Sequence, residues 1–324
     1  MTVDWNYILI IPVAVGALVF ALFLVWWERR LLGWWQDRLG PNRVGPFGVL
    51  QALADAIKLL MKEDWLPPFG DRAFFIMAPA IVAGSMLMAY VIVPFGPDLY
   101  ITDSNIAILF FLAMSSLAVY GVLLAGLSSN NKYAMLGGLR AAAQMVTYEV
   151  FMGLSLMGVV IHAGSFSLVD IVESQRDMWY IFPQCVGFLI FFMAGLAESH
   201  RLPFDLPEAE HELTAGFHTE YSGMKFALIM AAEYLAMVLT SALVVTLFFG
   251  GWLAPSFIPG AEYIPPVVWF GAKTLVFIHL FVLLRAAIPR PRYDKLMSLG
   301  WKVLLPLSLL NLLVTGGVSL WLQT

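Results

Sequence analysis

The sequence predicts an all-α polytopic membrane protein, and three observations support that fold class. Of the 324 residues, 60% are hydrophobic and 12% are charged, whereas soluble globular domains contain about 25% charged residues. Eight runs are long enough to cross a hydrocarbon core, which requires about 20 mostly apolar residues in a helix. Apolar residues are continuous in these runs and do not alternate as in the strands of a membrane barrel. We therefore expect helices, which satisfy their own backbone hydrogen bonds in lipid.

The eight expected spans belong to a single integral membrane domain that covers residues 1–324. They comprise residues 7–27, 73–94, 106–127, 141–161, 180–197, 224–250, 264–287 and 303–322. All lysines and arginines except Arg176 and Lys273 lie in or beside the connections after the first, third, fifth and seventh spans. Because positively charged connections stay in the cytoplasm, these four are predicted to be cytoplasmic and both termini periplasmic.

The first cytoplasmic connection contains a helical pattern over residues 49–62 that is too short to span. One face carries Leu50, Leu53, Ile57, Leu60 and Met61, and the other carries Gln51, Asp55, Lys58 and Lys62. Such an amphipathic helix is expected to lie along the membrane surface. Two interpretations stay open. The helix merely anchors a loop, or its polar face flanks the mouth of a cavity together with arginines of the same connection.

An acidic connection covers residues 198–223 and includes the stretch FDLPEAEHELTAGFHTE. Its carboxylates are Asp205, Glu208, Glu210, Glu212 and Glu220. Asp205, followed by Pro207 and Glu208, is typical of a helix N-cap with a capping box, so a short helix is expected to start there. A solvated acidic turn would also account for this composition.

Two glutamates, one lysine and one histidine lie well inside the expected spans, away from their ends. Glu149 and Glu233 each lie roughly 12 Å below the cytoplasmic surface, at about 1.5 Å per helical residue. An intramembrane charge costs at least a few kcal/mol unless it is neutralised or paired. The two glutamates are therefore either protonated structural groups or members of a proton relay. Lys273 and His279, in the seventh span, either cap a polar pocket or have a functional role.

Several classes of active centre have no support in the sequence. The single cysteine, Cys185, excludes a disulfide within the chain and an iron–sulfur cluster held by this chain alone. Nucleotide-binding and zinc-binding motifs are missing, and the spacing of His200, His211 and His218 does not require a metal. We expect no catalytic centre, no metal site and no nucleic-acid partner for this chain by itself.

Five motifs spread over the chain carry a family resemblance. They are WWERRLLGWWQDRLGPNRVGPFGVLQ (26–51), KEDWLPP (62–68), SSNNKYAMLGGLRAAAQMVTYEV (128–150), ESHRLPFDLPEAEHELTAGFHTEYSGMKFA (198–227) and RPRYDKLMSLGWK (290–302). They closely resemble the family of quinone-site membrane subunits of respiratory complex I, the proton-translocating NADH:quinone oxidoreductase. The resemblance runs nearly end to end. His200 departs from it, since the family usually has asparagine there.

The resemblance implies a membrane subunit that forms much of the quinone-access tunnel and couples quinone reduction to proton translocation in the bacterial cytoplasmic (inner) membrane. The implied tunnel residues are Arg29, Arg30, Asp55, Lys58, Arg72 and Arg285. The implied proton path comprises Asp205, Glu208, Glu210, Glu212, Glu220, Glu149 and Glu233, and its acidic loop is cytoplasmic. The substrate would be ubiquinone or menaquinone. NADH, FMN and the iron–sulfur clusters would belong to partner subunits.

The implied partners are the peripheral-arm iron–sulfur and quinone-site subunits, the small membrane subunits and the antiporter-like subunits. Two other interpretations compete with this one. A stand-alone cation/proton antiporter also uses intramembrane acids, but it predicts inverted repeats and interrupted helices that the sequence does not display. The membrane anchor of a membrane-bound hydrogenase is homologous and shares the acidic connection, so the chemistry of its partners would distinguish it.

Overall fold

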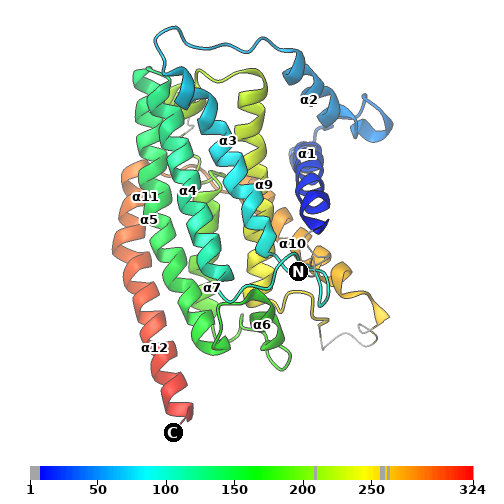
Figure 1. Cartoon of the computed structure of the whole chain (residues 1–324), viewed down its shortest axis with the longest axis vertical. Coiled ribbons are helices and arrows are strands. Elements are labelled where there is room, and N and C mark those ends of the chain that lie inside the picture. The colour runs from blue at the N-terminus through cyan, green and yellow to red at the C-terminus, as the bar shows by residue number, and fades with distance from the viewer. Residues whose placement is uncertain (1–7, 208–209, 256–259, 261–262, 324) are drawn as a thin grey trace, which may run out of the picture.

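The computed structural model describes residues 8–207, 210–255, 260 and 263–323, and helices are its main elements (Figure 1). In chain order they are α1 (Ile10–Trp35), η2 (Pro46–Gly48), α2 (Gln51–Met61), α3 (Arg72–Ala89), η3 (Tyr90–Ile92), α4 (Ala107–Ser128), α5 (Lys132–Ala163), α6 (Leu168–Glu173), α7 (Cys185–Glu198), α8 (Glu210–Leu213), η4 (Gly216–His218), α9 (Gly223–Phe248), α10 (Pro266–Ala287), α11 (Tyr293–Leu299), η6 (Gly300–Leu304) and α12 (Leu305–Gln323). The predicted all-α class is confirmed.

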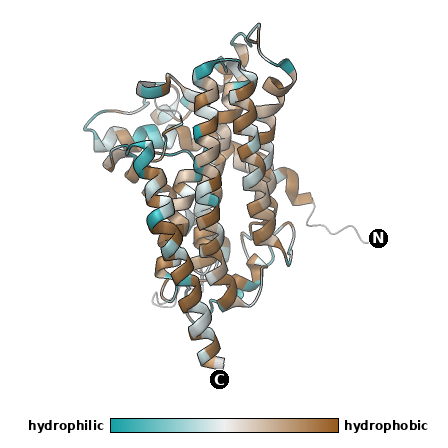
Figure 2. Cartoon of the chain, turned by 90° about the vertical axis from the view of Figure 1, so that its left-hand side faces the viewer, coloured by the Kyte–Doolittle hydropathy of each residue, from teal (hydrophilic) through white to brown (hydrophobic). Residues whose placement is uncertain are grey.

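Within the described residues, seven helices are long and apolar enough to cross a membrane. They cover Ile10–Trp35, Arg72–Ile92, Ala107–Ser128, Lys132–Ala163, Gly223–Phe248, Pro266–Ala287 and Tyr293–Leu322. Hydrophobic residues run along the long helices, whereas hydrophilic residues gather at the end opposite the C-terminus (Figure 2). These features confirm a polytopic membrane protein.

The expected span at 180–197 is the one that differs in kind. Its helix, α7, has 14 residues and is therefore about 21 Å long, whereas a hydrocarbon core is about 30 Å thick. The preceding residues form turns around Pro183, and the amide of Ile181 donates to the carbonyl of Phe248 at 2.9 Å. Proline removes a backbone donor and its ring clashes with the preceding helical turn, which favours a break in the helix, and here the apolar run is only partly helical.

Local caps explain why α5 is longer than its expected span at 141–161. The side chain of Asn131 accepts a hydrogen bond from the amide of Tyr133 at 2.9 Å, which satisfies a free donor at the helix start. At the other end, Gly164 adopts a left-handed conformation, with φ of +69°, which commonly ends a helix. α5 therefore extends from Lys132 to Ala163.

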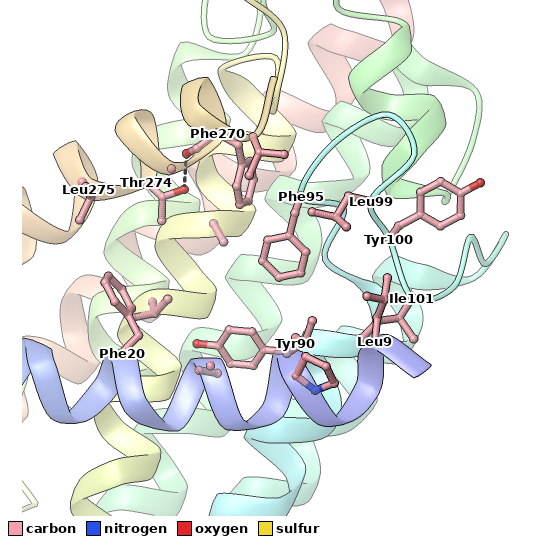
Figure 3. Close-up of a pocket in the computed structure, with 18 of the residues that line it drawn as sticks. Leu9, Phe20, Tyr90, Phe95, Leu99, Tyr100, Ile101, Phe270, Thr274 and Leu275 are labelled. Carbon is pink, nitrogen blue, oxygen red and sulfur yellow. Dashed lines mark hydrogen bonds between the residues drawn. The ribbon is translucent and has the colours of Figure 1, made fainter. Parts of the chain in front are cut away.

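The helices differ in how much of their surface the chain itself covers. In α9, 72% of the apolar window is buried, against 17% in α1 and 17% in the C-terminal helix. α9 is thus the central helix, with α3 and α7 packed against it, whereas α1 and α12 leave much of their apolar surface for other hydrophobic surroundings. α1 and α10 cross α9 at a steep angle (Figure 3).

The helix α2 lies beside the end of α1 at the edge of the bundle, where it also contacts α9 (Figure 1). It covers most of the amphipathic segment predicted at 49–62. Its apolar side chains Leu53, Ile57, Leu60 and Met61 are all more than half exposed. This confirms the amphipathic helix, and the exposed apolar face fits a helix that rests on a membrane surface.

The acidic connection is held against α5 by backbone contact. A Cβ atom on Gly137 would lie 2.6 Å from the amide nitrogen of Phe217 and 2.7 Å from the carbonyl carbon of Gly216. Glycine is therefore needed for this approach. The contact places η4 and the residues around it between the helices, where Phe217 is 1% exposed.

Candidate functional site

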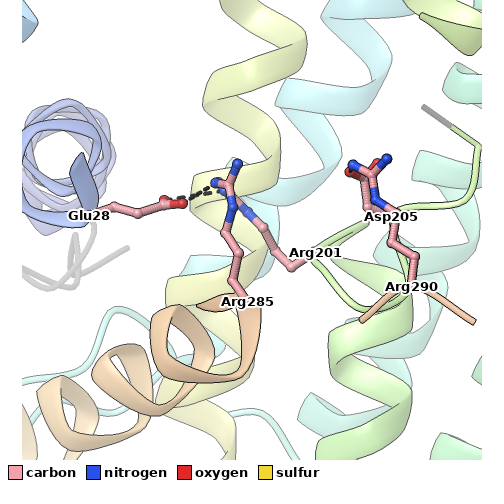
Figure 4. Close-up of polar contacts among 5 residues, drawn as sticks. All are labelled: Glu28, Arg201, Asp205, Arg285 and Arg290. Carbon is pink, nitrogen blue, oxygen red and sulfur yellow. Dashed lines mark hydrogen bonds and ion pairs between the residues drawn. The ribbon is translucent and has the colours of Figure 1, made fainter. Parts of the chain in front are cut away.

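A buried ionic cluster joins three distant parts of the chain. Glu28, on α1, pairs with Arg201, which follows α7, and with Arg285, on α10 (Figure 4). Nη1 of Arg201 lies 3.3 Å from Oε2 of Glu28. Glu28 is 2% exposed and Arg201 7% exposed. Charges so deeply buried persist only when they are paired.

Arg201 is the centre of this cluster. Its guanidinium carbon lies 3.9 Å from the centre of the Tyr234 ring. Burial lowers the pKa of Arg201, but the opposing effects of Glu28, Tyr234 and Glu233 are larger together and raise it above its ordinary value. Arg201 therefore stays charged, and it is electrostatically coupled both to Glu28 and to Glu233.

A large apolar cavity follows the same pair of helices, α1 and α10, away from the ionic cluster. Its volume is about 510 Å³, and the connection at 93–101 closes one side (Figure 3). Its walls include Phe20, Tyr90, Phe95 and Phe270. Phe20 and Glu28 are eight residues apart on α1, or about 12 Å. One helix thus carries an apolar cavity and, two turns further, a buried carboxylate.

Three of the expected tunnel residues meet at the junction of α1 and α2. Nη1 of Arg29 lies 2.8 Å from Oδ2 of Asp55, and Nζ of Lys58 lies 3.7 Å from Oδ1 of Asp55. Arg30 instead donates to the carbonyls of Pro41 and Phe47, so it stabilises the turn between α1 and α2.

The other two expected tunnel residues lie elsewhere. Arg285 belongs to the buried cluster with Glu28. Arg72 begins α3, where the amide of Asp71 donates to the carbonyl of Ser128 at 3.0 Å. The structure therefore brings Arg29, Asp55 and Lys58 together but places Arg72 at the junction of α3 and α4.

The acidic connection is tied to its surroundings by individual pairs. Asp205 pairs with Arg290 at 2.7 Å (Figure 4), and Glu212 pairs with Arg140 at 2.8 Å. Glu220 accepts from Asn131 at 2.7 Å. Glu208 lies outside the described residues, and Glu210 begins α8. The prediction that Asp205 caps a helix is wrong, because Leu206 is not helical, Pro207 lies in a turn and the carboxylate pairs with Arg290.

Inside the bundle, two carboxylates come together that are far apart in the sequence. Glu149 accepts hydrogen bonds from Ser115, at 3.1 Å, and from Ser116. Glu198, at the end of α7, interacts with the charge of Glu149 and with the side chain of Ser115. Since Glu149 lies near the middle of α5, α7 ends deep inside the bundle.

Glu198 also connects Glu149 to Glu233. A cavity of about 20 Å³ is lined by Glu198, His200 and Glu233 together with apolar residues of α3, α4, α5 and α9. A volume of about 10–15 Å³ suffices for one water molecule, provided that polar partners surround it. The geometry therefore joins the two glutamates predicted from the sequence through a third carboxylate and a space for water.

His200, which lines this cavity, and its neighbour His218 are both held neutral. Burial lowers the pKa of His200 to about 4, with a further contribution from His218. Burial likewise lowers the pKa of His218 to about 4. At neutral pH both rings can therefore accept a hydrogen bond without adding positive charge beside the carboxylates.

Lys273 and His279 have clear structural partners. Nζ of Lys273 donates to the carbonyls of Phe249, Gly251 and Leu253 at 2.7–3.1 Å, so this cation caps the end of α9. Nε2 of His279 accepts from the indole of Trp27 at 3.1 Å, which joins α10 to α1. These contacts favour the pocket-capping interpretation of both residues.

Sequence reasoning did not select Glu28, Glu198 or Arg201. Glu28 stands at the end of an apolar run beside two arginines, and this location resembles an ordinary membrane-boundary charge. Glu198 falls just after an expected span. For the two glutamates the signal is a carboxylate adjoining an apolar segment, which does not reveal burial, and Arg201 resembles the other cations of the cytoplasmic connections. Within the described residues, no group of three or more His, Cys, Asp or Glu side chains could hold a metal ion.

Comparison with known proteins agrees with the motifs. The family model described as "NADH dehydrogenase" matches residues 8–316. The chain belongs to the NADH dehydrogenase family. A relative in this family, an NADH-quinone oxidoreductase subunit of Methylococcus capsulatus (strain ATCC 33009 / NCIMB 11132 / Bath), is 59% identical over 311 residues, which cover 96% of each chain. This confirms the family resemblance.

Proposed function

We propose that this chain is the quinone-site membrane subunit of a proton-pumping NADH:quinone oxidoreductase, in which it couples quinone reduction to proton translocation. The position of Arg201 carries the proposal. This buried cation pairs with Glu28 at the α1–α10 wall and is coupled to Glu233 inside the bundle. It is therefore the physical connection between a substrate cavity and a set of buried carboxylates.

The tunnel is assigned to α1, α2, α10 and the segment after α7. Cavities that hold organic ligands measure about 300–1,000 Å³ and combine apolar walls with a few polar groups. The apolar cavity suits an isoprenoid chain of ubiquinone or menaquinone, and the cluster of Glu28, Arg201 and Arg285 suits a polar head group. Arg29, Arg30, Asp55, Lys58 and Arg72 support the entrance from the connections beside α1 and α3.

The proton path is assigned to the acidic connection and the bundle interior. Asp205, Glu208, Glu210, Glu212 and Glu220 form its entrance, and Glu233 and Glu149 continue it between the helices. Glu198 joins the last two. Reduction of a quinone to a quinol consumes two electrons and two protons. A change of charge beside Glu28 and Arg201 would alter the proton affinity of Glu233, because Coulomb interactions are strong where water is excluded.

Replacement of Glu233 with glutamine in the assembled complex tests this proposal. In proteoliposomes we expect the number of protons pumped per electron to fall severalfold, because glutamine has a similar shape but cannot carry the proton. Glu173→Gln is the matched control, since Glu173 is an exposed acid paired with Arg176. Unchanged proton pumping in an assembled Glu233→Gln complex would overturn the assignment.

The placement in the membrane follows from the distribution of cations. Both termini face the periplasm and the acidic connection faces the cytoplasm of a bacterial cell. The partners are the peripheral-arm iron–sulfur and quinone-site subunits on the cytoplasmic side, and small and antiporter-like membrane subunits beside the bundle. NADH, FMN and the iron–sulfur clusters belong to those partners. With Cys185 replaced by serine, single cysteines introduced at residues 173 and 212 test the orientation: in intact cells an impermeant reagent should label residue 173 and not residue 212.

A further inference from the structure

Ser115 occupies an unusual position for a buried serine. It lies on α4 and is 3% exposed, and its Oγ atom is 3.0 Å from the carbonyl of Leu112 and 3.1 Å from Oε1 of Glu149. It also interacts with the carboxyl of Glu198. A hydroxyl has one proton to donate. Ser115 therefore has two acceptors at hydrogen-bonding distance, the Leu112 carbonyl and Glu149, and the carboxyl of Glu198 lies close by as a third; its hydroxyl can donate to one of them at a time.

A buried serine in a helix normally satisfies itself locally. Ser155 on α5 shows this arrangement, because its hydroxyl donates to the carbonyl of Met152 at 2.7 Å and it is fully buried. Ser115 has the same local option through Leu112 but lies between two carboxyl groups as well. Its hydrogen-bonding capacity thus exceeds what the stability of α4 requires.

The carboxyl of Glu198 is buried beside Ser115 and lacks a hydrogen-bond donor of its own on one oxygen. It is 8% exposed, and its Oε2 atom has no hydrogen-bond partner within the described residues. The same carboxyl lines the small cavity that contains Glu233. Two neighbouring carboxylates repel each other when both are charged, so they share protons. The carboxyl of Glu198 therefore needs a donor and has a nearby carboxylate that competes for the same proton.

Ser116 helps to fix the orientation of the Glu149 carboxylate. Its hydroxyl donates to the same Oε1 atom of Glu149 that Ser115 contacts. Two adjacent hydroxyls of α4 thus hold one carboxylate oxygen toward α4. This orientation keeps the acceptor at hydrogen-bonding distance from Ser115.

We propose that the hydroxyl of Ser115 passes a proton between Glu198 and Glu149. This inference rests on the proposed function and adds one residue to its path. In the step, the carboxyl O–H bond of Glu198 breaks and its proton moves to Oγ of Ser115. At the same time the Oγ–H bond of Ser115 breaks and that proton moves to Oε1 of Glu149. Glu198 becomes ionised, Glu149 becomes neutral, and rotation of the new hydroxyl resets Ser115.

The test compares Ser115→Ala, Ser115→Thr and the matched control Ser155→Ala in the assembled complex in proteoliposomes. Only variants that copurify with their partner subunits and keep the wild-type thermal midpoint are compared. We expect the rate of proton pumping to fall about tenfold in Ser115→Ala, to recover in Ser115→Thr, which keeps a hydroxyl, and to stay at the wild-type level in Ser155→Ala. In Ser115→Thr the D2O isotope effect on pumping should equal that of the wild type.

Two further variants separate this inference from the proposed function. If Glu149→Gln and Glu198→Gln abolish pumping while Ser115→Ala pumps normally, the hydroxyl relay is refuted and the carboxylate path remains. If both glutamine variants pump normally, the carboxylate path itself is refuted. A loss in Ser115→Ala that Ser115→Thr does not reverse would also overturn the relay, because the hydroxyl would then not be the group that matters.

Discussion

Replacement of Glu28 with glutamine should destabilise the protein far more than the loss of a surface charge. The side chains of Glu28 and Arg201 are 3% and 8% exposed, whereas that of Arg285 is 38% exposed. Arg285 can turn to water, but Arg201 would keep a buried charge without its carboxylate partner. Breaking a buried pair costs about 3–5 kcal/mol. Glutamine retains the shape and one acceptor, so we expect a loss at the lower end of this range, about 3 kcal/mol.

The assay is thermal unfolding of the detergent-solubilised protein at one fixed heating rate, followed by tryptophan fluorescence. A loss of about 3 kcal/mol should lower the midpoint by about 6 °C, at about 2 °C per kcal/mol for a large domain. Asp55→Asn is the control. It removes the partner of Arg29 in a pair with side-chain exposures of 52% and 28%, which is worth at most about 1 kcal/mol. Equal shifts in the two variants would refute the reasoning from burial.

Three further predictions concern stability. Because the pKa of His200 is lowered in the folded protein, acid protonates this histidine in the unfolded chain at a higher pH than in the folded one. The contribution of neutral His200 to stability is therefore fully present above about pH 6.5 and is lost as the pH falls toward 4. At pH 5 the loss of folding free energy is about 2 kcal/mol. The variant His200→Gln should therefore have a thermal midpoint that is less sensitive to acid. An unchanged pH dependence of the midpoint would contradict this. The variant Lys273→Met should lower the free energy of unfolding by about 3 kcal/mol, because the carbonyls at the end of α9 lose their donor. Proton pumping by the assembled complex should stay intact. A loss of pumping at normal stability would show that Lys273 has another role. Gly137→Ala should lower the thermal midpoint by displacing residues 216–217, at a cost of about 1–3 kcal/mol, and a neutral substitution would mean that the segment moves freely.

The long spans were predictable because lipid imposes a simple requirement. Each spanning segment must be apolar and must satisfy its own backbone, so a continuous apolar run identifies a helix. The run at 180–197 is apolar, but only part of it satisfies its own backbone as a helix. Pro183 and the bond from Ile181 to Phe248 replace the first turns of the helix, and a long apolar run alone does not reveal such a substitution.

The candidate site was predictable in its chemistry and less so in its geometry. Glu149 and Glu233 could be selected because a carboxylate within an apolar run is costly. Their connection depends on Glu198, which reaches them only because α7 ends inside the bundle. Asp205 followed by Pro207 matched a capping pattern, but Arg290, 85 positions away, provides a stronger electrostatic partner. Contacts over such distances are not encoded in any local pattern.

The length of α7 sets the distance between the end of α9 and the buried carboxyl of Glu198. The turn before it is anchored to the end of α9, and its last residue is Glu198. Each inserted or deleted residue would shift Glu198 by about 1.5 Å and rotate it by about 100° around the helix axis. The same change would move Arg201, three residues later, away from Glu28. We therefore expect insertions within α7 to disrupt the molecule.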